Sequence, residues 1–529
     1  MVGLVVLPAD SVLRIVLLQF YFRCFYGVHT NFRVDLKALM YPEVTSYQDN
    51  SPHGRGYKEE KVSSGIRLEL MHRDHVESPL RSNVHDLTGL ERIRDEVLQT
   101  VGREETLFVR RLSNADKQVE IRKSSRKVLS TTDSNLDTIL PIKEHWRLQL
   151  QGTNYESPVM VTGAGYSMRI SLGSPTRTFH AFVDTGSDLP WLQCVPCRKC
   201  FEQSVELFDP KQSTTYTAVS CSSRVCQRLR QPQNYAGCKR SCRYTYFYGD
   251  ESYTSGDMAL ESLTIHSTDG DSLTVPRFAF GCGHNNAGSL NRTGASGIIG
   301  LGRGKFSFPS QLRPYIGSKF ATCFVNRELA SRQTSPLLFG DMVGMTVPGM
   351  QYTPMVTGNN SLPTFYYVNV EGISVGEKRV EISRTQDAFS IDPYTGEGGT
   401  ILDSGSTITS LVKDVYTRVM HEFFLQAPSY PRVNFSKYGL ELCFDISGIK
   451  DPLLPTLTFH LTNATWIMPS ENVALVVRDE NRGVYMCVAL TQSKFGANII
   501  GNIQQQNFQI VYDLANHQIG FAKVKCHTL

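Results

Sequence analysis

Short apolar and alternating runs, separated by Gly, Pro, Asn and Asp, fill the chain from Tyr166 onward. Repeated short strands with turn signals between them predict an all-β architecture, closed or sandwiched. The clearest runs are YSMRISLG (166–173), FAFGCG (278–283), FYYVNVEGISVG (365–376) and FQIVYDLANHQIGFA (508–522).

One later segment has the period of a helix instead. Within Leu411–Phe424 the apolar residues share a single helical face, so this segment predicts one of the few helices of the fold. The residues on that face are Val412, Val415, Val419, Met420 and Phe423.

The region before the strands, residues 31–155, has no cysteine and is rich in charge. Between residues 90 and 119 its apolar residues recur at loosely helical spacing, which indicates a partly helical segment. In a secreted protein such a leading region is a candidate pro-segment, and a separate helical domain or a disordered leader is the alternative. The apolar residues are Leu90, Ile93, Val97, Val101, Leu107, Val109 and Leu112.

Residues 1–30 form a possible but imperfect signal peptide, because Asp10 and Arg14 interrupt their apolar character. The longest apolar run there, Ile15–Phe22, is too short to span a membrane. No run of about 18 apolar residues occurs elsewhere, so we expect no integral membrane span.

Length and composition limit the function classes. A chain of 529 residues is too long for one core and predicts two or three units. A hydrophobic fraction of 41% with 20% charged residues is typical of a globular protein. The net charge of +4 gives no reason to expect nucleic-acid binding.

The cysteines are unevenly placed. Of the 13, one is Cys24 and the other twelve lie between Cys194 and Cys526, which predicts six disulfides and an oxidising compartment. The cluster CVPCRKC (194–200) could instead ligate a metal, but no matching Cys/His quartet follows at zinc-ribbon spacing, so disulfides are favoured. Four glycosylation sequons support secretion mildly: Asn291, Asn359, Asn434 and Asn463.

Two acidic turns occur in similar contexts. FVDTGSD (182–188) and ILDSGST (401–407) each lead two apolar residues into an Asp followed by a small turn. Each is followed later by an apolar–apolar–Gly element, SGIIGLG (296–302) and NIIGN (498–502). One such turn alone is ordinary strand-ending chemistry, whereas two ordered pairs form a specific constellation.

These motifs, with YGDESYTSG and the CVPCRKC insertion, resemble those of the pepsin-like aspartic proteases, and more narrowly the nepenthesin-type plant subgroup. The resemblance covers roughly Ser157–Cys526. It implies a bilobal β fold with few short helices, a cleft between the lobes and a removable pro-segment. We therefore expect a pro-segment at 31–155, an N-terminal catalytic lobe at 156–340 and a C-terminal lobe at 341–529.

The resemblance assigns the catalytic pair to Asp184 and Asp403, one from each lobe. Two carboxylates that share a site cannot both ionise easily, so they share a proton and activate a water between them. The turn residues would support the pair. Gly186 and Gly405 would bring backbone N–H groups close, Ser187 and Ser406 would donate hydroxyl hydrogen bonds, and Thr185 and Ser404 would cross-brace the turns.

Tyr248 matches the tyrosine on the β-hairpin flap of this family, with Gly249 and Asp250 beside it. By the same resemblance its phenol should reach the indole N–H of Trp191, and Thr407 should contact substrate. Two residues depart from the usual pattern. Glu251 stands in place of the second flap glycine and Pro190 precedes Trp191, which puts flap mobility and substrate preference in question.

The family pattern suggests six disulfides, although sequence alone does not fix their connectivity. The suggested pairs are Cys194–Cys197, Cys200–Cys282, Cys221–Cys242, Cys226–Cys238, Cys323–Cys526 and Cys443–Cys487.

The sequence thus predicts a monomeric, secreted aspartic endopeptidase that is made as a zymogen, acts on polypeptides at acid pH and needs no cofactor or metal. Its expected location is the apoplast or the vacuole. The alternative is a non-catalytic inhibitor or carbohydrate-enzyme-binding glycoprotein on the same fold. Such relatives tend to lose a catalytic Asp or the flap Tyr, all of which are present here. A further alternative is a structural extracellular glycoprotein whose turns carry no chemistry.

Overall fold

The computed structural model describes residues 66–72, 97 and 165–529, apart from 230–234, 249–251, 268–271, 289, 291–293, 328–331, 345–346, 358–361, 383–387, 393–397, 480–482 and 494–495. The possible signal peptide and most of the expected pro-segment lie outside these residues. Of the expected helical range 90–119 only Val97 is described, and it is helical and buried.

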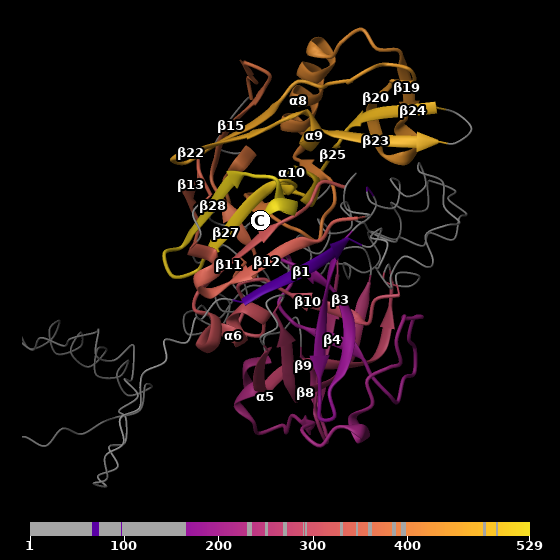
Figure 1. Ribbon diagram of the computed structural model, residues 1–529, viewed down its shortest axis with the longest axis vertical. Helices are drawn as coiled ribbons and strands as arrows, with labels where there is room; N and C mark the ends of the chain where they lie inside the picture. Colours follow the sequence, from indigo (N-terminus) through magenta and orange to yellow (C-terminus); the bar gives the residue numbers. More distant parts are fainter. Residues whose placement is uncertain are drawn as a thin grey trace, which may run out of the picture. The chain divides into compact units, whose positions relative to one another are not determined.

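The chain forms mostly strands, as the alternating pattern predicts (Figure 1). One sheet has fifteen strands in the order β13-β28-β27-β11-β12-β1-β2-β3-β10-β4-β9-β8-β7-β6, with β5 paired to β8. Their bounds are β1 Ile66–His72, β2 Tyr166–Leu172, β3 Arg177–Asp184, β4 Trp191–Gln193, β5 Thr217–Ala218, β6 Tyr235–Cys238, β7 Cys242–Phe247, β8 Tyr253–His266, β9 Ser272–Ala287, β10 Gly297–Gly300, β11 Lys319–Cys323, β12 Ser335–Phe339, β13 Gln351–Pro354, β27 Phe508–Asp513 and β28 Gln518–Lys523.

Three smaller sheets come from the later part of the chain. The five-stranded sheet has β14 Tyr366–Val368, β17 Thr400–Leu402, β26 Asn498–Ile500, β18 Thr409–Leu411 and β25 Leu490–Gln492. One four-stranded sheet has β16 Lys378–Arg379, β15 Val370–Val375, β21 Leu457–Leu461 and β22 Ala464–Met468. The other has β19 Arg432–Phe435, β20 Leu440–Asp445, β24 Gly483–Val488 and β23 Ala474–Asp479.

Helices are short and few among the described residues. The α-helices are α5 Arg224–Leu229, α6 Phe308–Ile316, α8 Lys413–Gln426, α9 Ser470–Val473 and α10 Asn502–Gln505, and the 3-10 turns are η2 Pro210–Gln212, η3 Gly340–Gly344, η4 Ser436–Tyr438 and η5 Cys526–Thr528. In the described part of the chain, no helix combines the length and the apolar character that a membrane span requires.

Helix α8 confirms the helix expected at 411–424, shifted toward the C-terminus by two residues at each end. Val415, Val419 and Phe423 on its predicted face are buried in the core. The shift has a local cause. Leu411 belongs to β18, and the N–H of Val412 donates to the Asn498 side chain rather than to a helical partner (2.9 Å).

The two acidic turns follow strands with equivalent pairing. β3 ends at Asp184 and pairs in parallel with β10, which also pairs with β4. β17 ends one residue before Asp403 and pairs in parallel with β26, which also pairs with β18. The apolar residues before each Asp are therefore buried strand, and each carboxylate lies where its strand leaves the sheet.

Strand β1, from the expected pro-segment, lies inside the large sheet beside β12 (Figure 1). It pairs antiparallel with β12 along five residues and with β2 at its end. The side chains of Leu68 and Leu70 are buried in the main hydrophobic core. Part of the leading region is thus packed as firmly as the strands around it.

Four of the expected disulfide pairs are wrong, and two of the corrections lie in the CVPCRKC insertion. The structure joins Cys194 to Cys282 and Cys197 to Cys200, in place of Cys194–Cys197 and Cys200–Cys282. The cause is the parallel pairing of β4 with β9, which sets Leu192 opposite Cys282. Cys194 is the residue directly after β4. Its Cα lies 5.4 Å from that of Cys282, within the range that a disulfide spans.

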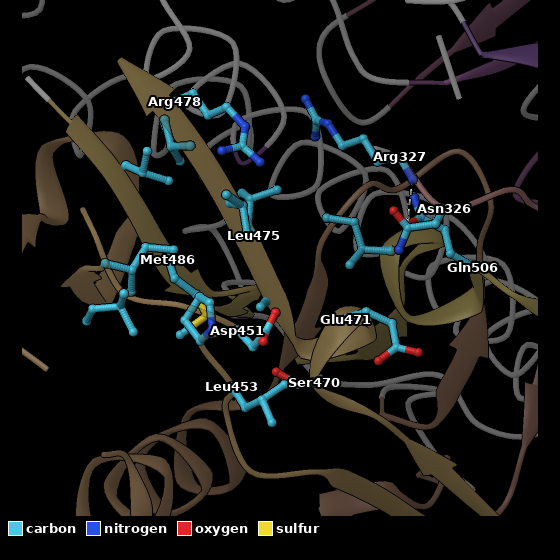
Figure 2. Close-up of a pocket in the computed structure, with 18 of the residues that line it drawn as sticks. Asn326, Arg327, Asp451, Leu453, Ser470, Glu471, Leu475, Arg478, Met486 and Gln506 are labelled. Atoms are coloured by element: carbon cyan, nitrogen blue, oxygen red, sulfur yellow. Dashed lines mark hydrogen bonds between the residues drawn. The ribbon is translucent and has the colours of Figure 1, made fainter. Parts of the chain in front are cut away.

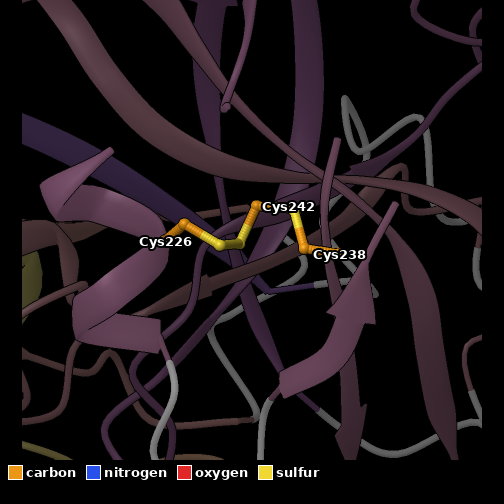
Figure 3. A group of neighbouring side chains, drawn as sticks. All are labelled: Cys226, Cys238 and Cys242. Atoms are coloured by element: carbon orange, nitrogen blue, oxygen red, sulfur yellow. A yellow bond between two sulfur atoms is a disulfide. The ribbon is translucent and has the colours of Figure 1, made fainter. Parts of the chain in front are cut away.

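The other two corrections lie near α5. Cys221 pairs with Cys238 in place of Cys242. Cys226 pairs with Cys242 in place of Cys238, and Figure 3 shows this bond. Cys226 and Cys242 are both fully buried in one hydrophobic cluster, whereas Cys238 is only partly buried at the turn of the β6–β7 hairpin. The sulfurs of Cys226, Cys238 and Cys242 lie within 4.8 Å of one another, but each is already bonded in a disulfide.

The last two disulfides are those expected. Cys323–Cys526 joins β11 to the C-terminal η5 turn, and Cys443–Cys487 joins β20 to β24 at directly opposed positions.

Candidate active site

The two acidic turns hold their carboxylates in the same way. The N–H of Gly186 donates to Oδ1 of Asp184 (2.9 Å), and the Ser187 hydroxyl donates to Oδ2 (2.5 Å). In the second turn the N–H of Gly405 donates to Oδ1 of Asp403 (2.9 Å), and the Ser406 hydroxyl donates to Oδ2 (2.8 Å).

Both catalytic candidates are almost completely buried, at 1% exposure for Asp184 and 2% for Asp403. The two turns face each other closely. A Cβ placed on Gly186 would lie 2.7 Å from Oδ1 of Asp403, so only glycine leaves room for the second carboxylate there. The structure therefore brings the two acids into one site, 219 residues apart in the chain.

Reciprocal hydrogen bonds cross-brace the turns. The N–H of Ser404 donates to the Thr185 hydroxyl (2.8 Å), and the N–H of Thr185 donates to the Ser404 hydroxyl (3.2 Å). All four groups are buried. Buried backbone N–H groups need partners, so each turn depends on the other for its hydrogen bonding.

Tyr512 of β27 interacts with both turns and was not expected from the sequence. Burial raises the pKa of its phenol well above the usual value; Thr322 lowers this pKa in part, the Asp403 charge raises it by a smaller amount, and Thr185 lowers it least. The phenol therefore stays neutral and adds no charge near the pair. Its ring stacks on Phe320, with centroids 4.5 Å apart.

The flap tyrosine makes the hydrogen bond that was expected. The indole N–H of Trp191 donates to the Tyr248 hydroxyl (2.7 Å), and both side chains are largely buried. The ring of Tyr246, two residues earlier, lies 5.1 Å from that of Tyr248, and its hydroxyl accepts from the N–H of Asp188 (3.3 Å). Residues 188–191 thus contact both tyrosines.

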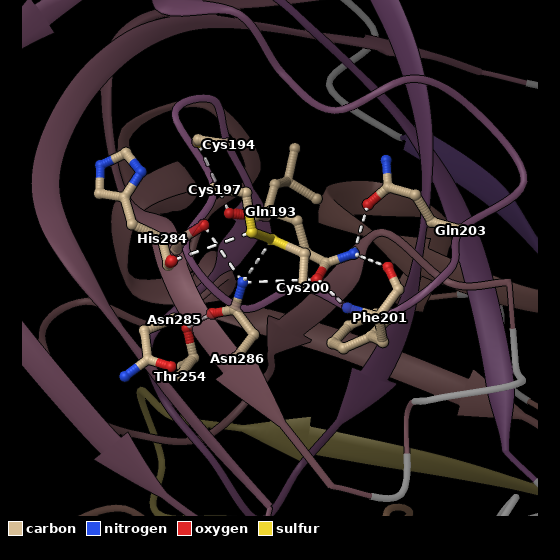
Figure 4. The surroundings of a disulfide bond; sticks show 12 residues. Gln193, Cys194, Cys197, Cys200, Phe201, Gln203, Thr254, His284, Asn285 and Asn286 are labelled. Carbon is tan, nitrogen blue, oxygen red and sulfur yellow. Dashed lines mark hydrogen bonds between the residues drawn. A yellow bond between two sulfur atoms is a disulfide. The ribbon is translucent and has the colours of Figure 1, made fainter.

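The cysteine-rich insertion is anchored to the strand that carries Trp191 (Figure 4). Gln193 of β4 donates to the carbonyl of Phe201 (2.9 Å) and accepts from its N–H (3.0 Å). Asn286 of β9, only 1% exposed, donates to the carbonyl of Gly283 (3.1 Å) and accepts from Thr254 (2.7 Å). The N–H of Asn286 also donates to the carbonyl of Lys199 (2.7 Å), so the insertion is fixed to both β4 and β9.

Other expected site residues fall in different places. Gly249, Asp250 and the departing Glu251 lie outside the described residues, as do the sequons at Asn291 and Asn359. Thr407 is buried at the end of the second turn, where its carbonyl accepts from Ile503 (3.1 Å). Pro190 keeps Trp191 in register, since its carbonyl accepts from Gly281 of β9 (2.8 Å).

Asp188 was missed by the sequence reasoning. Its carboxylate accepts from the N–H of Gly304 (2.8 Å) and from the Thr364 hydroxyl (2.7 Å). A visible signal was the second acid in DTGSD, four residues after Asp184, together with the glycines of GLGRG (300–304).

A cavity of ≈ 780 Å³ lies elsewhere, between α9, α10, β23 and β24 (Figure 2). Among the described residues that line it, none belongs to the two acidic turns. In the view, the side chains of Arg327 and Arg478 lie above those of Asp451 and Glu471. Its apolar wall shares residues with the cluster that buries Val97, so the cavity belongs to the surroundings of that contact.

Comparisons with known proteins show which family this chain resembles. Two protein-family models match, one described as xylanase inhibitor N-terminal over residues 166–341 and one as xylanase inhibitor C-terminal over residues 365–523. Aspartic proteinase nepenthesin-1 of Nepenthes gracilis is 39% identical over 373 residues, which are 70% of this chain and 80% of that protein.

Two proteins of Arabidopsis thaliana are also similar. Aspartyl protease family protein 2 is 39% identical over 369 residues, 69% of this chain and 72% of that protein. The protein named Aspartic protease in guard cell 2 is 34% identical over 469 residues, 88% of this chain and 89% of its own.

Solved structures of seed proteins share the fold. Basic 7S globulin from soybean superposes with a TM-score of 0.55 at 21% identity, over 69% of this chain and 94% of that chain. Conglutin gamma from lupine seeds superposes with a TM-score of 0.53 at 20% identity, over 69% of this chain and 94% of that chain. At these identities the likeness shows the pepsin-like fold alone. The level of identity and the coverage of the protease relatives show more, and the chain belongs to the nepenthesin-type plant aspartic proteases.

Proposed function

We propose that this chain is an aspartic endopeptidase, secreted as a zymogen, that hydrolyses polypeptides at acid pH through Asp184 and Asp403. The observation that carries the proposal is the matched pair of buried, facing carboxylates with identical hydrogen-bond donors. The proteinase names of the relatives support it.

The geometry suits catalysis by an activated water. Two carboxyl groups held face to face cannot both ionise easily, because their negative charges repel each other, so the pair shares one proton. The ionised carboxylate takes a proton from a water held between the two acids, while the protonated one donates to the peptide carbonyl oxygen. Attack gives a tetrahedral diol, and proton transfer to the leaving nitrogen completes the cleavage. The Tyr248 flap would shield this water from solvent.

The zymogen part of the proposal is supported by two contacts of the leading region. Strand β1 occupies a central place in the large sheet. Val97, 4% exposed, packs in a cluster with Ile408, the residue after the second turn. It also lies against Gly439, where a Cβ would come within 2.4 Å of its side chain.

A side-chain hydrogen bond also attaches the leading region, since the Thr334 hydroxyl donates to Glu69 of β1 (2.5 Å). We propose that maturation on acidification cuts the chain near 150–160 and releases the leading region.

Secretion is supported by the six disulfides, which persist in oxidising compartments. Two described sequons, Asn434 and Asn463, are exposed and accessible to glycosylation. The apoplast and the vacuole both fit the proposed acid activity.

A direct test is peptide cleavage at about pH 4, between the apparent pKa values that such pairs show, with and without pepstatin. We expect cleavage that pepstatin abolishes, and loss of cleavage in Asp184→Asn and Asp403→Asn. Folded, N-terminally shortened protein that cleaves nothing would favour the alternative, a binding protein or inhibitor on this fold. Full activity of Asp403→Asn would refute the assignment of the pair.

A further inference from the structure

Asp188 connects the first catalytic turn to two distant segments. It lies four residues after Asp184, and its two carboxylate oxygens accept from different partners, Gly304 N–H (2.8 Å) and Thr364 Oγ1 (2.7 Å). Gly304 follows β10, and Thr364 precedes β14. Hydrogen bonds to an ionised carboxylate are about twice as strong as neutral ones, so this side chain is a strong link between the segments.

The loop after β10 is shaped to receive this carboxylate. A Cβ on Gly302 would lie 2.4 Å from Oδ1 of Asp188, and a Cβ on Gly304 would lie 2.2 Å from Oδ2. The same loop holds the turn by its backbone, because Leu301 donates to the carbonyl of Asp184 (2.7 Å) and Gly302 to that of Ser187 (2.8 Å). The turn and the loop therefore form one unit.

That unit is bound to residues 364–366 by further hydrogen bonds. The Arg303 N–H donates to the Thr364 carbonyl (2.9 Å), and its guanidinium donates to the Phe365 carbonyl (3.1 Å). The Tyr366 hydroxyl donates to the Leu301 carbonyl (2.6 Å). Burial raises the pKa of this phenol and the Asp188 charge raises it further, so it remains a neutral donor.

Residues 364–366 lead directly to the second catalytic turn. Tyr366 begins β14, which pairs with β17, and its partner there is Leu402, the residue before Asp403. The position of the second turn that corresponds to Asp188 is Thr407, so the second turn has no matching carboxylate. The link from one turn to the other is thus one-sided, and it is separate from the Thr185–Ser404 cross-brace.

We propose that Asp188 is a positioning residue for the catalytic pair: through Thr364, β14 and β17 it forms a second brace that sets the spacing of Asp184 and Asp403. This inference rests on the proposed function for its catalytic consequence. Spacing matters because closer like charges separate the two apparent pKa values of a pair more widely. A looser brace should therefore narrow the bell-shaped pH profile of kcat.

The test uses Thr364→Val, which removes one hydroxyl with little change of shape, with Thr364→Ser as the matched control that keeps it. Asp188→Asn and Asp188→Ala form a graded second series. In Thr364→Val we expect kcat per pepstatin-titrated site to fall on the order of tenfold, with a smaller change in KM. A loss of this size corresponds to one lost hydrogen bond to a charged group. The pH profile of kcat should narrow, and Thr364→Ser should restore both kcat and the width of the profile.

A merely structural role would give a different result. It would lower the melting temperature and the fraction of titratable sites, but leave kcat per site and the width of the pH profile unchanged. That result in both Thr364→Val and Asp188→Asn would overturn the proposal, even if Asp188→Ala failed to fold.

Hydrogen exchange on the full chain tests the brace without any activity. We expect Thr364→Val to speed exchange both in 300–304 and in β17, on the two sides of the link. Faster exchange in 300–304 alone would overturn the brace. Absence of peptide cleavage by folded, N-terminally shortened protein without any substitution would refute the proposed function instead, and leave the exchange result to decide on the brace.

Discussion

At the residue scale, the two proposed catalytic carboxylates have nearly equal surroundings. Each accepts from the N–H of a turn glycine and from a serine hydroxyl, at 2.9 Å and 2.5 Å for Asp184 and at 2.9 Å and 2.8 Å for Asp403. With such matched donors neither acid is strongly preferred for ionisation, so the proton belongs to the pair and the apparent pKa values are those of the pair. Any difference in the tendency of the two acids to ionise has to come from groups beyond these bonds, for example from Asp188, which lies near Asp184 and has no counterpart in the second turn.

The hydroxyl of Tyr248 should matter for catalysis. Tyr248→Phe leaves the Trp191 indole N–H without its acceptor, and a buried unpaired donor costs about 1–3 kcal/mol. We expect kcat/KM to fall by about tenfold, because the flap loses its closed position. Steady-state kinetics with active-site titration would measure this.

Tyr352→Phe is a matched control, since this tyrosine is 40% exposed in β13. Trp191→Phe should reduce kcat/KM to a similar extent, and the double variant should be little worse than either single one. Additive losses, or unchanged kinetics in Tyr248→Phe, would contradict the flap assignment.

The duplication of the two acidic turns allowed Asp184 and Asp403 to be predicted as a pair, whereas Asp188, which has no counterpart in the second turn, was missed. Asp184 and Asp403 stand in two similar motifs, and chemistry gave a reason for the pair. The role of Asp188 depends on partners 116 and 176 residues away in the chain. The spacing of residues within a short stretch of sequence does not predict such contacts.

At the element scale, the periodicity of apolar residues predicted the strands and the long helix, but it did not predict which strands pair with each other. The buried runs before each Asp are strands because their apolar residues fill the core on both faces. The Cys194–Cys282 pair depends on the parallel alignment of β4 with β9, which is set by tertiary packing. Disulfide partners could therefore not be read from the spacing of cysteines.

Strand β3 contains an acid-sensitive histidine. Burial and, to a smaller extent, Arg169 on the neighbouring strand lower the pKa of His180 from 6.5 to about 4. Between these pH values the unfolded chain binds the proton and the folded chain does not, so His180 reduces stability as the pH falls from 6.5 to about 4.

We expect His180→Gln to shrink the difference in melting temperature between about pH 7.5 and about pH 4.5, because the ionisable group that binds more protons in the unfolded state is gone. Calorimetry at the two pH values measures this difference. His266→Gln, at an exposed position at the end of β8, is the control. An unchanged difference in His180→Gln would show that the folded histidine titrates normally.

At the scale of the whole molecule, the large sheet combines segments from far apart in the chain. Strand β1 lies between β12 and β2, and β27 and β28 extend the same sheet (Figure 1). The Cys323–Cys526 disulfide closes a separation of 203 residues, and the Arg67 side chain donates to the carbonyl of Leu529. The charged leading region gave no sign of this, since the alternation of a single seven-residue strand is too weak to stand out.

The place of β1 makes the full chain depend on a segment that the proposed maturation removes. Leu70 is fully buried in the main core, so Leu70→Ala should destabilise the full chain by about 2–5 kcal/mol and lower its melting temperature. Leu425→Ala, at a leucine that is 56% exposed, should leave the melting temperature nearly unchanged.

The decisive comparison is made after acid maturation. If the cut near 150–160 releases residues 66–72, the matured Leu70→Ala and unmodified proteins have the same sequence and must melt at the same temperature. A difference that persists in the matured proteins would mean that β1 stays in the sheet after the cut, held by its backbone pairing with β12 and β2. In that case 66–72 would be a permanent strand of the enzyme, and only the chain between it and residue 165 would belong to the part that leaves.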